Sequence, residues 1–358
     1  MKIIHCADLH LDSKMNSLPT EKNRIRKEET LLSFEKMVSY AKENGVSVII
    51  LAGDTFDTGK ISAKSKGRVL YAIENAPQID FLYLSGNHDE DGFASSLEYV
   101  PENLKFFGNE WTYFVYDRVT IAGVILNENN TDSIYDTVNF PENGLNVAVL
   151  HGQIAGYKTN SQAETISIPR LKGRNIDYLA LGHIHSYSEG VIDSRGTYAY
   201  SGCLEGRGFD ETGDKGFVLL NIEGNKISER FVKFSSREIY VYEYDVTGKQ
   251  NFLSVRDEIV SDLKNKYNEK SLIKLVIKGE YTADFDSDFS GLSMLLNEYF
   301  FFVKIEDKTI LQLKTEDYET DKSIKGEFVR KVLSSNLDEE EKKQIILIGL
   351  NALKGKEF

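Results

Sequence analysis

Short apolar runs separated by amphipathic segments fill the first quarter of the chain. Lys2–Cys6 is strand-like, Val46–Ala52 is continuously apolar, and Asp80–Leu84 is a third run of this kind. Between them, helix-spaced apolar positions predict helices over about Glu28–Glu43 and Ser62–Glu74. A βαβαβ order favours parallel strands whose sheet is covered by helices.

From Trp111 onward the pattern changes to short strands with turn residues between them. Hairpins are predicted across Asp117-Arg118 and across Glu223-Gly224-Asn225. Because helices are not evident between these strands, we expect a second, mostly antiparallel sheet packed on the first. The predicted fold class is α/β, a two-sheet β-sandwich flanked by helices. The strands assigned to the second sheet are Trp111–Tyr116, Val119–Ile125, Asn146–Leu150, Tyr178–Leu181, Gly196–Tyr200, Gly216–Ile222 and Lys226–Phe234.

A domain boundary is predicted near Phe234–Arg237, so that residues 1–235 form the larger domain. Residues 236–320 are expected to form a small α+β cap domain, and residues 321–358 are expected to form two helices. The predicted cap elements are strand Glu238–Tyr244, helix Asn251–Tyr267, strand Leu272–Ile277, a helix near Ser290–Glu298, and strands Phe300–Ile305 and Thr309–Leu313.

Composition narrows the class of protein and its compartment. The 358 residues carry a formal net charge of −13, and neither predicted half is basic, which argues against nonspecific coating of nucleic acid. Two distant cysteines, Cys6 and Cys203, and no signal-peptide pattern favour the cytoplasm. No apolar stretch approaches the roughly 20 residues that span a bilayer, so no membrane association is expected.

Five of the six histidines lie in short motifs rich in Asp, Asn and Gly, each directly after a strand-like run. Strand ends that carry imidazoles and carboxylates can hold two divalent ions on one rim of a sheet. Such a centre supports hydrolysis of a phosphate ester. The motifs are Asp8-Leu9-His10, Gly53-Asp54, Gly86-Asn87-His88-Asp89, His151-Gly152 and Gly182-His183-Ile184-His185.

Spacing suggests how these residues share the work. Asp8 and His10 can face one ion together, and Asp54 is the natural bridging carboxylate. Asn87 offers an amide oxygen. The remaining histidine, His5, lies inside the first strand and is interpreted as a packed structural residue. The shell is completed by His151, His183 and His185.

Taken together, these motifs resemble the calcineurin-like metallophosphoesterase superfamily over about residues 1–235. The resemblance implies that His88 faces the scissile phosphate without binding metal, and that Asp57 orients His88. A surface turn carboxylate is the alternative for Asp57. The implied ligands are Asp8, His10, Asp54 and His185 for one metal, and Asp54, Asn87, His151 and His183 for the other.

Other stretches resemble a narrower group, the SbcD-type DNA repair exonucleases. They are Ala7–Ser13, Pro169-Arg170-Leu171 leading into Asp177–His185, and Tyr200–Arg207 followed by Glu211 and Lys215-Gly216. This resemblance implies manganese-favoured cleavage of DNA ends or hairpins, dimerisation through the catalytic domain, and an SMC-like coiled-coil ATPase partner. Alternatives are a phosphodiesterase or phosphatase for small nucleotides, and a non-catalytic scaffold of the same fold.

Four basic residues are candidates for substrate contact: Arg24, Lys60, Lys64 and Arg207. The first three follow the first two metal motifs and could bind flanking phosphates. Alternatively, they belong to ordinary solvated helix faces paired with neighbouring glutamates. Arg207 sits in a glycine-rich turn, where it either reaches substrate or supports the site. Apolar stripes on the C-terminal helices either pack against their own protein or form a partner groove.

Overall fold

The computed structural model describes residues 1–57, 61–86, 92–156, 165–282, 285, 288–312 and 318–353. The chain divides into two compact units, Met1–Ile239 and Tyr240–Phe358. The division falls a few residues after the boundary expected near Phe234–Arg237. Among the described residues, the helices are too short or too polar to cross a bilayer.

The first sheet contains the predicted βαβαβ start, which is confirmed. Its strand order is β14-β13-β1-β2-β3-β4, with β1 to β4 parallel and β13 antiparallel to both β1 and β14. Helices α1 (Thr20–Glu43) and α2 (Ala63–Glu74) connect its first three strands. The strands are β1 (Lys2–Cys6), β2 (Val48–Ala52), β3 (Asp80–Leu84), β4 (Leu104–Phe106), β13 (Gly216–Glu223) and β14 (Lys226–Lys233).

The second sheet differs from the prediction in two respects. Its four central strands pair in parallel, and only the edge strands β5 and β11 are antiparallel. The predicted hairpin β13–β14 exists but belongs to the first sheet. The sheet order is β11 (Ser188–Val191), β12 (Thr197–Tyr200), β10 (Tyr178–Gly182), β7 (Leu145–His151), β6 (Val119–Gly123) and β5 (Thr112–Tyr116).

The prediction of antiparallel pairing failed because the crossover helices are short. Helices α4 (Ile134–Thr137) and α5 (Ile168–Leu171) have four residues each, too few to show a helical period in the sequence. A short ribbon, β8 (Gln153–Ile154) with β9 (Thr165–Ile166), lies in the same crossover as α5.

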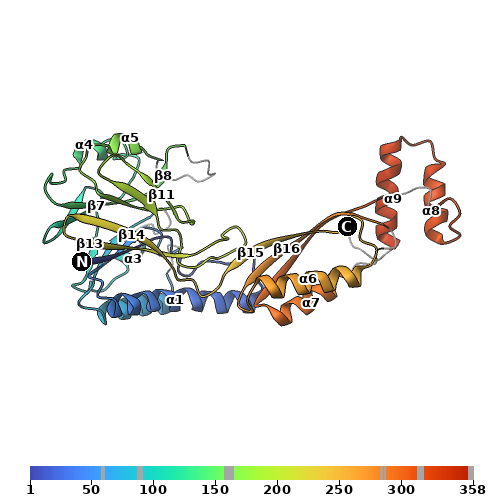
Figure 1. The fold of residues 1–358 in the computed structure, drawn as a ribbon, viewed down its shortest axis with the longest axis horizontal. Coiled ribbons are helices and arrows are strands. Elements are labelled where there is room, and N and C mark those ends of the chain that lie inside the picture. The colour runs from blue at the N-terminus through green and yellow to red at the C-terminus, as the bar shows by residue number, and fades with distance from the viewer. Residues whose placement is uncertain are drawn as a thin grey trace. The chain divides into compact units, whose positions relative to one another are not determined.

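The sandwich has an apolar core between its sheets and a further apolar layer on each outer face. Val48, Ile121 and Val147 belong to the core between the sheets. Figure 1 shows α1 on one side of the sandwich and α4 and α5 on the other. This layering brings the carboxyl ends of parallel strands from both sheets to one rim. Another short helix, α3 (Gly92–Ser95), follows β3.

The second unit is built on a three-stranded sheet of order β15-β16-β17. The two last strands predicted for the cap are one strand, because Asp307 and Thr309 pair in register with Ile277 and Gly279 of β16. The elements are β15 (Ile239–Asp245), α6 (Phe252–Lys266), β16 (Leu272–Tyr281), α7 (Phe289–Tyr299), β17 (Phe302–Leu311), α8 (Ile324–Leu333) and α9 (Glu339–Leu353).

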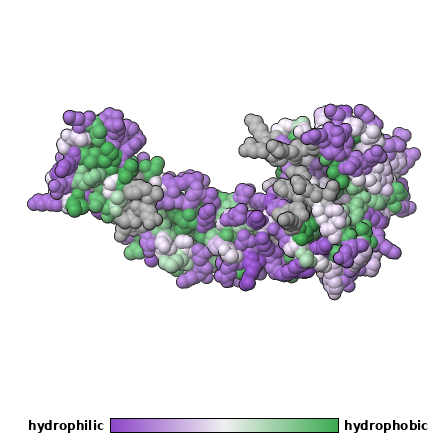
Figure 2. Space-filling view, turned by 180° about the vertical axis from the view of Figure 1, so that it is seen from behind, coloured by the Kyte–Doolittle hydropathy of each residue, from purple (hydrophilic) through white to green (hydrophobic). Residues whose placement is uncertain are grey.

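The last two helices, α8 and α9, pack closely on each other. A Cβ atom at Gly349 would lie 2.1 Å from the Phe328 ring, so glycine lets the helices approach. Figure 2 shows apolar side chains on these helices, and Ile324 and Ile348 are exposed.

Candidate metal centre

The strand-end motifs converge on one rim as two groups of ligands. In each group the ligand atoms lie within 4.8 Å of one another. The first metal group is Asp8, His10 and His185, and the second metal group is Asp54, His151 and His183. Six of the seven predicted ligands are therefore brought together. The seventh, Asn87, lies outside the described residues, as do the predicted catalytic His88 and the basic residue Lys60.

Asp54 reaches both groups through one oxygen. Its Oδ2 lies 3.2 Å from Nε2 of His151 and 3.8 Å from Nε2 of His10. The carboxylate is buried, with almost no solvent to compete for it. A single oxygen between two sets of imidazoles is the position that a bridging carboxylate needs.

The backbone is strained where it carries the ligands. Asp8, His10, Asp54 and His183 adopt positive φ angles of 52°, 43°, 51° and 103°. Seven non-glycine residues of the described chain have such angles, so more than half of them are ligands in these two groups. Each costs on the order of 1–3 kcal/mol and persists only where surrounding contacts enforce it. Backbone hydrogen bonds from Asp8 and His10 to residues 53 and 54 provide such contacts.

Two glycines allow the strand ends to approach this closely. A Cβ at Gly53, which has φ +90°, would lie 2.1 Å from Nδ1 of His151. A Cβ at Gly182 would lie 1.9 Å from the carbonyl oxygen of Ala52. Any larger residue at either position would therefore displace the backbone or the imidazole.

Three ligand imidazoles are oriented through their outer nitrogen. Nδ1 of His10 donates to Asp57 at 2.9 Å, and Nδ1 of His185 donates to Glu211 at 2.7 Å. Nδ1 of His151 donates to the carbonyl of Ala52 at 2.9 Å. With the proton on Nδ1, each Nε2 points inward as a potential metal ligand.

The donor set fits two divalent cations. Nε2 of His10 and Nε2 of His185 face each other at 3.1 Å, so a proton or cation must lie between them. Burial lowers the pKa of His10, whereas at His185 the bond to Glu211 outweighs burial and raises the pKa. Burial opposes the charge on His151, yet Asp54 and Asp8 raise its pKa to about 9. Without metal, each group thus holds a proton where a cation would bind.

A carboxylate–guanidinium clamp supports the first metal group. Arg207 donates to Glu211 at 2.7 Å and to Asp57 at 3.3 Å, so it joins the two carboxylates that hold His185 and His10. We call Asp57, Arg207 and Glu211 the clamp. Arg207 thereby takes a supporting position, while the predicted pairing of Asp57 with His88 stays a prediction. Sequence reasoning noted Glu211 only as part of a motif, because nothing in its spacing links it to His185.

The other basic candidates lie on helix surfaces. Lys64 of α2 is 65% exposed and pairs with Glu28, and Arg68 binds the same carboxylate. Arg24 is exposed on α1. The Lys64 pair is what the solvated-face alternative describes.

The sixth histidine has a structural environment. His5 is fully buried in β1; its Nδ1 accepts from the Tyr178 hydroxyl at 2.9 Å, and its Nε2 lies 3.2 Å from the Leu181 carbonyl. Burial lowers the pKa of His5 to about 3, so it remains neutral.

Two ligand groups that share one carboxylate on the rim of a two-sheet sandwich define a dinuclear metal-dependent phosphoesterase. The calcineurin-like phosphoesterase family matches residues 1–187, more than half of the chain, and the protein belongs to this family. The predicted superfamily, fold and enzyme class are thereby confirmed.

Relatives in other organisms agree with this family. The chain is 28% identical to the uncharacterized metallophosphoesterase YhaO of Bacillus subtilis, over 78% of this chain and 72% of that protein. It is 25% identical to the SbcD component of the SbcCD nuclease of Staphylococcus epidermidis, over 68% and 73%. It is also 25% identical to the DNA double-strand break repair protein Mre11 of Methanopyrus kandleri, over 78% and 65%.

Proposed function

We propose that this phosphoesterase is a DNA repair nuclease subunit that cleaves phosphodiester bonds. The observation that carries the proposal is Asp54 Oδ2, which lies within 4 Å of an imidazole from each metal group. Such a centre suits in-line attack on phosphorus. The names of two relatives, the SbcCD nuclease and Mre11, supply the substrate class.

The chain's own residues would do three things. The first metal group and Asp54 would hold one ion; Asp54, His151, His183 and Asn87 would hold the other. Two bound divalent ions lower the pKa of water and neutralise charge on the phosphate. His88 would stabilise charge or protonate the leaving group. We favour Mn²⁺, since imidazole and carboxylate donors accept several first-row metals and the resemblance implies manganese.

Partners follow from the same resemblance. We propose that the protein acts on DNA in the cytoplasm, as a dimer, together with an SMC-like coiled-coil ATPase. The exposed apolar residues Ile324 and Ile348 of the C-terminal helices are available for such a partner.

A small-nucleotide phosphodiesterase is the second candidate. It is favoured by the net charge of −13 and by the pairing of Lys64 and Arg68 with Glu28, which leaves less free positive charge near α2. The third candidate, a non-catalytic scaffold, is disfavoured by the intact ligand groups.

The deciding experiment compares Mn²⁺-supplemented cleavage of single-stranded, blunt and hairpin DNA with cleavage of a cyclic nucleotide. We expect DNA cleavage that is lost by roughly 10²-fold or more in His88→Ala while metal content is kept. Hydrolysis of the cyclic nucleotide alone would overturn the nuclease proposal in favour of the second candidate.

A further inference from the structure

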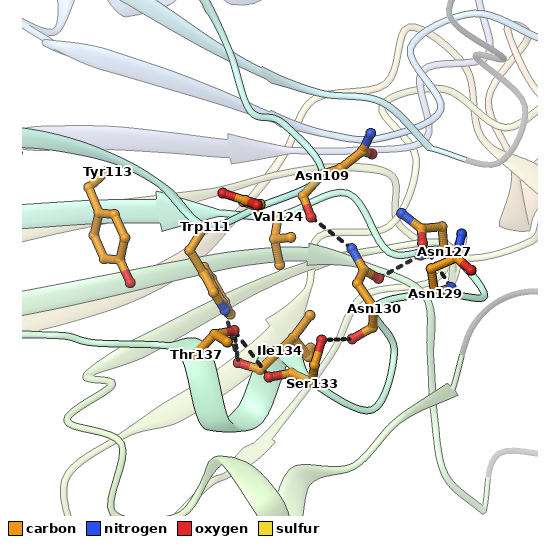
Figure 3. Close-up of a pocket in the computed structure, with 11 residues that line it drawn as sticks. Asn109, Trp111, Tyr113, Val124, Asn127, Asn129, Asn130, Ser133, Ile134 and Thr137 are labelled. Carbon is orange, nitrogen blue, oxygen red and sulfur yellow. Dashed lines mark hydrogen bonds between the residues drawn. The ribbon is translucent and has the colours of Figure 1, made fainter.

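A second recess lies in the same unit as the metal centre, where β5 begins and β6 ends. Its volume is about 610 Å³, within the range of small-molecule sites. Val124 and Ile134, both buried, form part of its lining, and four asparagines and the chain's only tryptophan contribute to the rest. Figure 3 shows the Trp111 indole between Tyr113 and the asparagine-rich turn.

The aromatic wall is fixed in place. Nε1 of Trp111 donates to the Ile134 carbonyl at 2.9 Å, and the indole packs edge to face on Phe140. Because the ring is already oriented, a planar ligand that stacks on it would pay little entropy to order it. An aromatic ring of this kind stacks on any nucleobase, since every base has a π-face.

The polar wall is equally ordered but leaves hydrogen-bonding groups available. The side chain of Asn130 accepts from the Asn127 amide and donates to the carbonyls of Asn109 and Ile125. Asn127 Oδ1 in turn accepts from the amide of Asn129. The side-chain NH₂ of Asn127 has no hydrogen bond to any residue that the structure describes. Amide groups of this kind pair with the edges of bases.

Charge selects against a phosphate in this recess. None of its eleven described lining residues is Lys, Arg or His, and Glu110 adds a carboxylate. A phosphate would therefore be repelled, whereas a neutral, flat group with donors and acceptors at its edge matches both walls.

The recess lies near the metal rim but around the edge of the sheet. β6 runs parallel to β7 with Gly123 beside Val149, so the turn after β6 begins one strand away from His151, at a spacing of about 4.8 Å. Val124 and Ile134 belong to the apolar layer on the outer face of this sheet. A ligand here would lie beside the reacting phosphate's site and not over it.

We propose that this recess, walled by Trp111 and Asn127, is a nucleobase-binding subsite that positions the substrate of the metal centre. The proposal rests on the proposed function in assuming a nucleotide-containing substrate. The base would stack on Trp111, and its edge would be read by the asparagine amides, while the phosphodiester chain extends toward the rim. The same chemistry suits a base from a mononucleotide or from an unpaired strand.

Because Trp111 is the only tryptophan, its fluorescence reports directly on the recess. The experiment titrates the full chain in EDTA with thymidine, adenosine, a thymidine trinucleotide, glucose and inorganic phosphate, correcting for absorbance. We expect saturable quenching by the nucleosides and the trinucleotide but not by glucose or phosphate. Tighter binding of the trinucleotide would identify a strand as the source of the base, and equal binding a mononucleotide.

Matched variants complete the test. Asn127→Ala should weaken nucleoside binding, and Asn265→Ala, an exposed change on α6, should leave it unchanged. Trp111→Ala, followed by calorimetry and checked for folding by circular dichroism, should weaken binding by roughly 5- to 150-fold, the scale of base stacking. Failure of nucleosides to bind, or equal binding of glucose, would overturn the subsite. Because no metal is present, that result is independent of whether the centre cleaves DNA.

Discussion

The two metal groups are built from similar residues but are held by different means. In the first group, His10 and His185 depend on side-chain carboxylates that Arg207 joins. In the second, His151 depends on the backbone carbonyl of Ala52. Backbone carbonyls cannot be removed by substitution without changing the fold. The second group is therefore set by the sandwich itself, whereas the first is set by three replaceable side chains.

The largest effect should come from the residue that belongs to both sides of this comparison. Asp54→Asn removes the charge that one oxygen presents to His10 and His151, so we expect loss of both ions and a fall in turnover of roughly 10³-fold or more. Metal content by mass spectrometry and turnover are the measurements. Asp257→Asn, an exposed change on α6, is the control. Two ions retained at full occupancy would show that Asp54 does not bridge.

Next in size is a pH effect on the metal-free protein, centred on the second group. The pKa of His151 is about 9 in the folded state against 6.5 for the free side chain. Its contribution to stability is therefore fully present below pH 6.5 and is lost as pH rises through 9. The lowered pKa values of His10 and His183 leave them neutral across this window.

We accordingly expect the free energy of unfolding in EDTA to fall by roughly 3 kcal/mol between pH 6.5 and 9.5. Urea unfolding measured across this range tests it, with His151→Gln expected to flatten the profile. A wild-type profile as flat as that of the variant would contradict the Asp54–His151 pairing. Metal binding, which must displace this proton, should strengthen over the same interval.

The part of this comparison that could be predicted from sequence is uneven. Ligands at strand ends were predictable because each motif directly follows an apolar run, and six of them meet as expected. The pairing of β13 with β1 was not predictable, since strand spacing says nothing about which sheet a hairpin joins. Nor was Glu211, whose link to His185 arises only when the turn after β12 folds back. Interactions between remote segments carry no local pattern.

A smaller and more selective effect is expected in the clamp. Glu211→Gln keeps the shape of the side chain but removes the charge that holds His185 and Arg207. We expect the affinity for one of two Mn²⁺ ions to weaken by about 10- to 100-fold, with the other unchanged. Calorimetric titration resolves the two binding events, and Glu269→Gln on the surface is the control. Equal weakening of both ions would show that the two groups are not held separately.

The smallest effect should come from a charge outside both groups. Lys64 is 65% exposed and is already paired with Glu28, so Lys64→Ala should change the free energy of unfolding by less than about 1 kcal/mol. For the same reason, DNA affinity should change by less than about threefold, and both metal affinities should stay the same. Lys22→Ala on α1 is a matched control. A tenfold loss of DNA affinity with a shallower dependence on salt would instead show that Lys64 leaves Glu28 to contact a phosphate, which would extend the functional surface from the metal rim onto α2.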